Sequence, residues 1–409
     1  MAEQASRPQA RRGLVAAAAG LLLAFGLGGC ELVPAPRVES PPADLGPPSA
    51  SPAPGTEAPP VASQPAQPEL PDDRDRGRVA LLVPLSGPNA AVGQSIANAA
   101  NLALLDTGER RIRLTVYDTA RAGAGAAANE ALAAGSRLFL GPLLADDVRA
   151  VAPVARRADV PVVSFSNDVS VAGEGVYLIG FTPAESVARV VSYARSQGLA
   201  RFAALTPQGV FGERVAQAMI DSTQRSGARL IGMQSFERDA ASLRAAVANL
   251  SGPGGYDAIL IGESSRAAAL AIPYVRSGAS PRARVLGTEV WANDPAVGGV
   301  PALRGAWFAA VSDTMFEQMR SRYRARYGAD PHRLASLGYD AVLLAIRASR
   351  DWRAGRPFPQ RALRDPAGFL GIDGPFRFGA GNVAERALEV REVTAGATVV
   401  VSPAPRTID

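Results

Sequence analysis

The sequence has very few of the side chains that most often carry catalysis or bind metal ions. Its 409 residues include one cysteine, Cys30, and one histidine, His332. One cysteine cannot form an intramolecular disulfide, and one histidine cannot build a multi-histidine metal site. No nucleophile stands in the sequence with an evident base to activate it. We therefore expect a protein that is not an enzyme, with no catalytic residues, no metal and no cofactor.

Lysine is absent, and all 43 basic residues are arginine. They are mixed with 38 acidic residues, so the net charge is only +5, and no basic run is interleaved with aromatic residues. Nucleic-acid-binding surfaces concentrate positive charge in a patch or stripe, so we expect no nucleic-acid partner. A hydrophobic content of 47% supports a packed core, and the length allows two domains.

The apolar run at the N-terminus is short. It covers residues 13–27 and follows three arginines, and it falls below the roughly 20 residues that a membrane-spanning helix needs. A basic start, a short apolar stretch and small residues describe a secretory signal. The residues Leu27, Gly28, Gly29 and Cys30 resemble the lipobox of bacterial lipoproteins, in which the cysteine is acylated and becomes the first residue. This resemblance implies a signal peptide over 1–29 and a lipid anchor on Cys30; an ordinary signal peptide cut nearby is the alternative.

A proline-rich segment follows the cysteine. Thirteen prolines lie between Pro34 and Pro71, with no apolar period that could build a core. We expect residues 30–77 to form a lipid-anchored tether, which at about 3.1 Å per residue could reach on the order of 140 Å if fully extended. It either lets the following domain work far from the membrane or merely clears the membrane surface. Glu31, in place of aspartate, implies by resemblance to enterobacterial sorting rules an outer-membrane protein facing the periplasm.

From residue 78 onward, apolar runs of strand length alternate with helical patterns. "VALLVPL", "IRLTVYD", "RLFLGPL" and "VPVVSFS" are typical of parallel strands buried on both faces, and "RFAALTP", "RLIGMQSF", "YDAILIGE", "RVLGTEVW" and "GAWFAAV" continue the series. Strands that alternate with helices favour a doubly wound α/β sheet. The number of strands is too high for one open sheet, so we expect two lobes. His332, after Pro331, is expected to start a helix.

The segments "VALLVPLSGPNAAVGQSIANAANLAL", "LFLGPLLADDVRAVAPVARRADVPVVSFSND", "FGERVAQAM", "LGYDAVLLAIRA" and "GIDGPFRFGAGN" resemble the type I periplasmic-binding-protein family of the leucine/isoleucine/valine-binding kind. The resemblance covers about residues 78–401. It implies two lobes, each a doubly wound parallel sheet flanked by helices, joined by a hinge of three crossings. The first lobe would hold 78–181 plus 310–350, the second 182–309 plus 351–401, and 402–409 would form a C-terminal tail.

Ligands of open α/β sheets bind beyond the carboxyl ends of the strands. The residues predicted to line a cleft there are Ser86, Asp146, Ser164, Ser166 and Asn167 in the first lobe and Phe211, Glu263 and Glu289 in the second. Each has a structural alternative: Asp146 and Asp147 could cap their helix, the serines could cap their own loop, Glu263 could be a solvated strand end, and Phe211 could pack in the core.

Amino-acid-binding relatives hold the ligand carboxylate with hydroxyl groups and backbone amides at a helix N-terminus. The corresponding loop here, "GPLLADD", has two carboxylates and no hydroxyl, and these would repel a ligand carboxylate. Two functions remain open. Lipoproteins with such a head resemble outer-membrane activators of penicillin-binding proteins, which stimulate a peptidoglycan synthase by contact, although larger members carry an extra helical-repeat domain. The alternative is a receptor that delivers branched-chain amino acids or similar ligands to an ABC permease.

Overall fold

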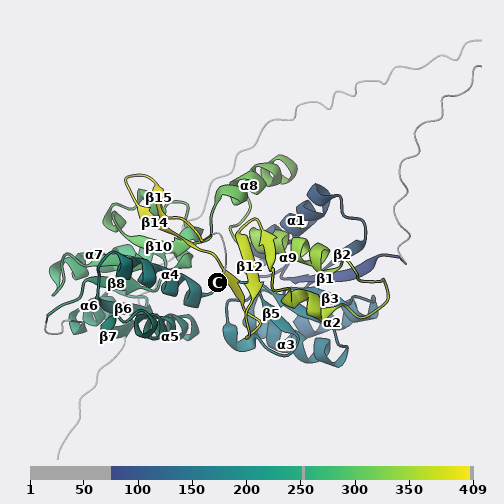
Figure 1. The fold of residues 1–409 in the computed structure, drawn as a ribbon, viewed down its shortest axis with the longest axis horizontal. Coiled ribbons are helices and arrows are strands. Elements are labelled where there is room, and N and C mark those ends of the chain that lie inside the picture. Colours follow the sequence, from purple (N-terminus) through teal and green to yellow (C-terminus); the bar gives the residue numbers. More distant parts are fainter. Residues whose placement is uncertain (1–74, 251–253, 406–409) are drawn as a thin grey trace, which may run out of the picture. The chain divides into compact units, whose positions relative to one another are not determined.

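The computed structural model describes residues 75–250 and 254–405, and it contains two large β-sheets flanked by helices (Figure 1). The expected signal peptide, the lipobox with Cys30, and nearly all of the tether lie outside the described residues. Within these residues, no helix is both long enough and apolar enough to cross a membrane.

The first lobe is built on a parallel sheet with the strand order β2-β1-β3-β4-β5. Its strands are β1 (Gly77–Val83), β2 (Ile112–Asp118), β3 (Leu138–Leu140), β4 (Val162–Ser164) and β5 (Val176–Leu178). Its helices are α1 (Ala90–Thr107), α2 (Ala124–Ala133), α3 (Ala145–Arg157), α8 (Thr314–Tyr327) and α9 (Ala335–Ala348). The apolar run of β1 is fully buried because helices cover both faces of the sheet.

The second lobe is built on a seven-stranded sheet with the order β15-β14-β10-β9-β8-β6-β7. Its strands are β6 (Arg201–Pro207), β7 (Arg229–Phe236), β8 (Ala258–Ile261), β9 (Arg284–Gly287), β10 (Trp307–Ala310), β14 (Glu389–Val393) and β15 (Thr398–Ser402). Its helices are α4 (Pro183–Ser196), α5 (Val210–Arg225), α6 (Ala240–Asn249) and α7 (Ser265–Ser277). β14 pairs antiparallel with both β10 and β15. The pairs β10–β9, β9–β8 and β8–β6 are parallel.

β11 (Phe369–Gly371), β12 (Gly374–Phe378) and β13 (Ala384–Arg386) form a small antiparallel sheet of their own, which packs on the first lobe and is joined to β5 by a single bridge between Val383 and Leu178. Short 3₁₀ turns complete the described part: η1 (Val169–Val171), η2 (Glu289–Asn293), η3 (Val297–Gly299), η4 (Pro301–Leu303) and η5 (Gln360–Arg364). The predicted α/β class and the two-lobed architecture are confirmed.

The segment 351–401 does not lie wholly in the second lobe, as the sequence-based boundaries had it. Trp352, Phe358, Leu363, Phe369 and Phe376 belong to the hydrophobic core of the first lobe, whereas the second core resumes at Leu388. They share this core with apolar side chains of α1 and α9, and burying them there removes a large apolar area from water. The chain therefore passes between the lobes after β5, after β10 and between β13 and β14.

Two local predictions also differ from the structure. The strand expected over "RVLGTEVW" ends at Gly287, and η2 follows. Gly287 lacks a side chain where the ring of Trp291 packs, and a Cβ there would lie 2.4 Å from the indole, so the chain turns back onto its own strand. His332 precedes α9, which begins at Ala335, and its ring accepts a hydrogen bond from the backbone of Leu334.

Candidate ligand cleft and hinge

The loops after β1, β3 and β4 meet η2 and the loop before α9 around a cavity of about 380 Å³, here called the cleft cavity. It is lined by Asn89, Val92, Leu143, Leu144, Phe165, Asn167, Phe181, Glu289, Val290, Asn293, His332 and Leu334. This is the carboxyl edge of the first sheet, where parallel strands leave a crevice between diverging loops.

Close packing of the loops positions these residues. Gly93 of α1 lies directly over the end of β1, and a Cβ there would come within 1.8 Å of the carbonyl oxygen of Pro84. Gly141 turns the chain after β3 with a φ of +90°, a conformation that favours glycine. The close approach at Gly93 and the turn at Gly141 place Asn89 and Leu144, the N-cap residues of α1 and α3, at the cavity wall.

Of the eight residues predicted to line a cleft, Asn167 and Glu289 line the cleft cavity. Ser164 and Ser166 do not line it, because both are buried and serve their own loop. The hydroxyl of Ser164 donates to the carbonyl of Pro142 at 2.9 Å and accepts from the backbone N–H of Ser166 at 3.0 Å. The hydroxyl of Ser166 accepts from the backbone N–H of Asp168 at 3.1 Å. Both serines therefore cap their own loop, which was the structural alternative to a role in ligand binding.

Asp168 continues this polar loop toward the second lobe. Its carboxylate pairs with Arg149 of α3 at 3.0 Å and with Arg214 of α5 at 3.2 Å. Since Arg214 belongs to the second lobe, Asp168 is an ionic contact between the lobes. The sequence motif around "SFSND" therefore stabilises the loop and an interlobe contact more than it furnishes ligand contacts.

Ser86 and Asp146 also turn away from the cleft cavity. The Ser86 hydroxyl donates to the Asp118 carboxylate at 2.8 Å. The Asp146 side chain is 95% exposed and pairs with Arg149 at 2.7 Å. The expected capping bond is not made, because Leu144 is the N-cap of α3 and no side chain caps it. Asp146 and Asp147 stand in the first turn, where the helix dipole favours negative charge.

Phe211 and Glu263 have structural roles in the second lobe. Phe211 is half-buried against the core on one face of the second sheet. The carboxylate of Glu263 pairs with Arg238 at 2.8 Å, and its carbonyl accepts from the indole N–H of Trp291 at 2.8 Å. Glu263 thus pairs its charge with Arg238 and helps to hold η2 in place through Trp291, and it does not stand ready to bind the amine of a ligand.

Among the described residues that line the cleft cavity, Glu289 alone has a carboxyl group, and it accepts a hydrogen bond from the hydroxyl of Ser186. Burial raises its pKa from 4.5 to about 7, although the Ser186 hydrogen bond acts in the opposite direction. Glu185 lies beside it, and burial likewise raises the pKa of Glu185 to about 7 against the lowering effect of Arg386. Both carboxyl groups therefore titrate near neutral pH.

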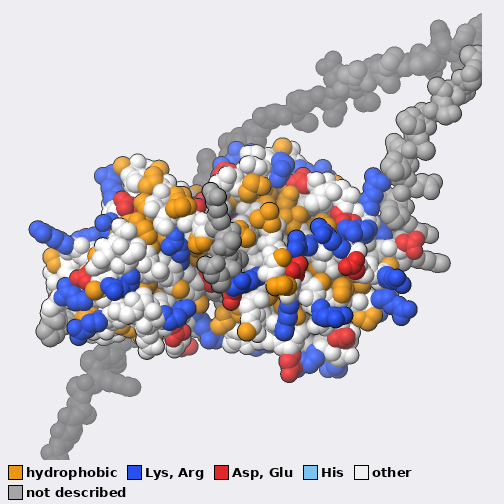
Figure 2. Space-filling view, in the orientation of Figure 1, with side chains coloured by type: hydrophobic (Ala, Val, Ile, Leu, Met, Phe, Trp, Pro, Cys, Tyr) orange, Lys and Arg blue, Asp and Glu red, His pale blue; other side chains and the backbone are white. Residues whose placement is uncertain are grey.

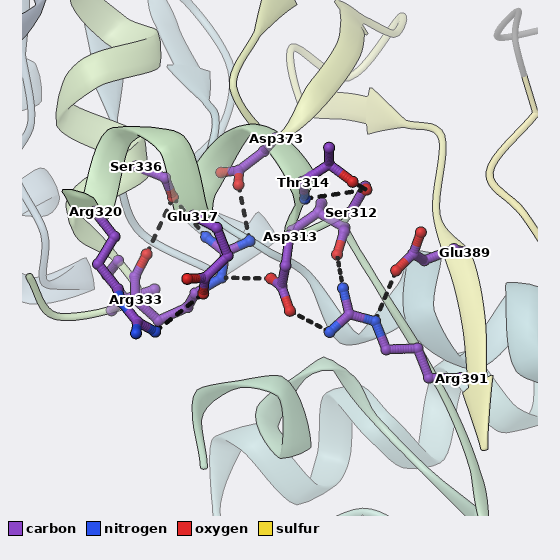
Figure 3. A network of polar contacts seen from close by, with 12 residues as sticks. Ser312, Asp313, Thr314, Glu317, Arg320, Arg333, Ser336, Asp373, Glu389 and Arg391 are labelled. Atoms are coloured by element: carbon purple, nitrogen blue, oxygen red, sulfur yellow. Dashed lines mark hydrogen bonds and ion pairs between the residues drawn. The ribbon is translucent and has the colours of Figure 1, made fainter. Parts of the chain in front are cut away.

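A hinge network joins the connections between the lobes and consists of Asp313, Arg333, Asp373, Glu389 and Arg391 (Figure 3). Asp313 lies in the connection after β10 and pairs with Arg333 at 3.4 Å and with Arg391 of β14. Arg333 also donates to Asp373 of the first lobe at 2.8 Å, and Arg391 to Glu389 at 2.7 Å. Asp313 thus links the two buried arginines, one from each lobe.

A family model described as "Periplasmic binding protein" matches residues 77–397. The chain belongs to the periplasmic binding protein family. The strand order, the two lobes and the cleft cavity between them agree with this assignment, and the expected type I periplasmic-binding-protein fold is confirmed.

Solved structures of binding proteins share the fold. A leucine-binding protein, LivK, from Thermotoga maritima has a TM-score of 0.61 at 19% identity, covering 80% of this chain and 98% of its own. A putative branched-chain amino acid ABC transporter protein from Rhodospirillum rubrum has a TM-score of 0.68 at 20% identity, covering 80% and 100%. LpoA from Haemophilus influenzae has a TM-score of 0.61 at 20% identity, covering 80% of this chain but 59% of LpoA.

An uncharacterized protein of Rickettsia prowazekii is 26% identical over 174 residues. The match covers 42% of this chain and 47% of that protein, so it spans about half the length of this curated relative.

The cleft of this periplasmic binding protein contains residues that sequence patterns did not single out, among them Asn89, Asn293 and His332. Asn89 lies shortly after the predicted strand "VALLVPL", so the rule that ligands bind beyond the carboxyl ends of strands could have identified it. Asn293 and His332 come from a 3₁₀ turn and from a loop before a helix, and only the packing of the two lobes brings them to the cavity.

The rest of the described surface carries mixed charge. Figure 2 shows arginine side chains spread over the drawn face with acidic side chains among them. In the ranges 75–250 and 254–405, no group of His, Cys, Asp and Glu could hold a metal ion. The family and its solved neighbours are binding proteins.

Proposed function

We propose that this protein is a non-catalytic lipoprotein of the cell envelope that activates a penicillin-binding protein, a peptidoglycan synthase, by direct contact. In this proposal Cys30 carries a lipid in the outer membrane, the proline-rich segment up to residue 77 is the tether, and the periplasmic-binding-protein head faces the periplasm and contacts the synthase. The fold likeness to LpoA supports it.

The observation that carries the proposal is the altered N-terminus of α3. Leu144 caps this helix without a side-chain hydrogen bond, and Asp146 and Asp147 occupy its first turn. An amino-acid receptor needs hydroxyl groups and uncompensated N–H groups there to bind a carboxylate. Two carboxylates at that point oppose an anionic ligand, and neither the N-cap nor the first turn of α3 has a hydroxyl side chain, so the head lacks there the hydroxyl contacts with which an amino-acid receptor holds a ligand carboxylate.

The test uses the full-length lipidated protein and the purified synthases of the same organism. We expect the protein to co-purify with one synthase and to raise its rate of glycan polymerisation. In detergent solution, the Cys30→Ala variant should stimulate as well as the wild type, because contact is made by the head. In the intact envelope, only the wild type should support activation. Absence of both binding and stimulation with every synthase would refute the contact function.

A receptor for an ABC importer is the second candidate, because the cleft cavity of about 380 Å³ lies in the range of small-ligand sites. Lobe closure around a ligand would then be the mechanism. A thermal-shift screen with amino acids tests it, since a ligand at one hundred times its dissociation constant stabilises by about 2.7 kcal/mol. A clear shift with a branched-chain amino acid would favour the receptor over the activator.

A further inference from the structure

Apolar side chains from both lobes dominate the cleft cavity. The first lobe contributes Val92, Leu143, Leu144, Phe165 and Leu334, and Phe181 and Val290 come from the connection after β5 and from η2. Leu144, the N-cap residue of α3, is 40% exposed at this wall, so a large apolar side chain faces solvent in the cleft cavity. A ligand that covered this surface would gain about 25 cal/mol for each Å² of apolar area removed from water.

No arginine lines the cleft cavity, although arginine accounts for all 43 basic residues of the chain. Arg333 and Arg386 lie behind the lining ring of Phe181, with their guanidinium groups 5.7 and 5.3 Å from its centroid, but neither lines the cavity. Asp146 and Asp147 stand in the first turn of α3. They offset the positive end of the helix dipole, which would otherwise attract an anion. A ligand carboxylate would therefore lose its hydration in the cavity without gaining a charged partner.

The polar groups that line the cleft cavity are neutral or close to neutral at pH 7. Three are the amides of Asn89, Asn167 and Asn293. The Nδ1 atom of His332 accepts a hydrogen bond from the backbone N–H of Leu334 at 3.1 Å, so the ring proton is on Nε2. His332 is exposed at this wall, and partial desolvation by its neighbours lowers its pKa, so the ring is neutral at pH 7 and Nε2–H is a donor.

The remaining polar group, Glu289, adds no permanent charge. Its carboxyl accepts from Ser186 and titrates near neutral pH because burial raises its pKa to about 7. A carboxyl group that keeps its proton part of the time can donate a hydrogen bond as well as accept one. The wall on the second-lobe side therefore suits a hydroxyl or carbonyl group as well as it suits an amine.

We propose that the cleft cavity binds a small, uncharged and largely apolar molecule that carries one or two hydrogen-bonding groups, and not an amino acid or another carboxylate. The proposal does not depend on the contact function proposed above, since a protein that acts by contact can also hold a ligand between its lobes. It rests on the apolar lining, the absence of a cation among the lining residues and the neutral amides.

Four probes of similar size separate the ligand classes: benzyl alcohol is uncharged, benzylamine is a cation, benzoate is an anion, and leucine is a zwitterion. Isothermal titration at pH 7 with the full-length protein gives their affinities. We expect benzyl alcohol to bind at least about tenfold more tightly than benzoate or leucine, a difference of about 1.4 kcal/mol. Benzylamine should fall between them, because Glu289 is ionised part of the time.

A charge introduced at the cavity wall tests the location. Leu144→Lys places an ammonium group at the cavity, and Leu270→Lys places one on α7, where the leucine is 64% exposed and lines none of this cavity. We expect Leu144→Lys to bind benzyl alcohol about tenfold more weakly and benzoate about tenfold more tightly than the wild type does. Leu270→Lys should bind both probes with the affinities of the wild type. Both leucines are exposed, so neither change should prevent folding.

Three outcomes would overturn the proposal: benzoate or leucine binding the wild type as tightly as benzyl alcohol, no measurable binding of any probe, or equal behaviour of the two lysine variants. Tight leucine binding would also favour the receptor, the second candidate function. The contact function itself is judged by stimulation of a synthase, which is measured separately, so failure here is distinguishable from failure of the contact function.

Discussion

Replacing Glu289 with glutamine should stabilise the protein above neutral pH and leave its stability nearly unchanged in mild acid. Burial raises the pKa of Glu289 from 4.5 to about 7 in the folded protein. A shift of roughly 2.5 units corresponds to about 3 kcal/mol of free energy, because one unit is about 1.4 kcal/mol. Since Glu289 lines a cavity that solvent can enter, about 3 kcal/mol is an upper limit on the stability lost when this group ionises.

The sign follows from proton binding. Between pH 4.5 and about 7 the folded protein keeps the proton on Glu289 while the unfolded chain has lost it. The free energy of unfolding therefore falls as the pH rises through this window, and the loss is complete above it. Glutamine is neutral at every pH and its oxygen can still accept from Ser186, so the variant avoids the loss.

Urea unfolding followed by tryptophan fluorescence at about pH 5 and about pH 8 measures the effect. The advantage of Glu289→Gln over the wild type should grow from near zero to about 1–3 kcal/mol between these conditions. Asp340, whose pKa burial also raises to about 7, titrates in both proteins and cancels in the comparison. Glu317→Gln, in an exposed pair with Arg320, is the control and should change little at either pH. An advantage that does not depend on pH, or a variant less stable than the wild type at about pH 8, would refute the reasoning.

Three further predictions concern the hinge, the core and the anchor. Asp313→Asn should lower the free energy of unfolding by about 2 kcal/mol, because it removes the carboxylate shared by two buried arginines that each keep only one other carboxylate, Asp373 or Glu389. Chemical unfolding checks this, and an unchanged midpoint would contradict it. Gly338→Ala should cost about 1–3 kcal/mol, because a Cβ would meet the backbone oxygen of the neighbouring helix at 2.3 Å. The same measurement on Gly299→Ala, where a Cβ meets nothing within 4 Å, should show little change. Radiolabelled palmitate should attach to the full-length protein and not to Cys30→Ala; equal labelling of both would exclude the anchor.

Much of the local structure follows from the sequence. The strand predicted over "RFAALTP" agrees with the structure, where β6 spans Arg201–Pro207, because its apolar run is nearly continuous and a proline ends it. The carboxyl ends of the strands also predict which edge of the first sheet holds the cleft. Asn167 and Glu289 could be named on this ground alone.

The same patterns cannot tell which way a loop side chain turns. Ser164 and Asp146 stand at the predicted edge, but one faces into the protein and the other into solvent. The hydrogen-bonding needs of the neighbouring backbone decide the first case, and the nearness of Arg149 decides the second. A pattern of residue types carries neither piece of information.

The sequence by itself determined the alternation of strands and helices, the parallel arrangement, the division into two lobes and the absence of the residue types that most catalytic sites need. These depend on residue type and short-range period, which act within one element. Tertiary structure alone decided that residues 351–387 complete the first lobe, that His332 and Asn293 share one cavity, and that Asp313 links two arginines from different lobes. Such contacts join residues far apart in the chain. They form where folding removes apolar surface from water and pairs each buried charge with an opposite one at the same time.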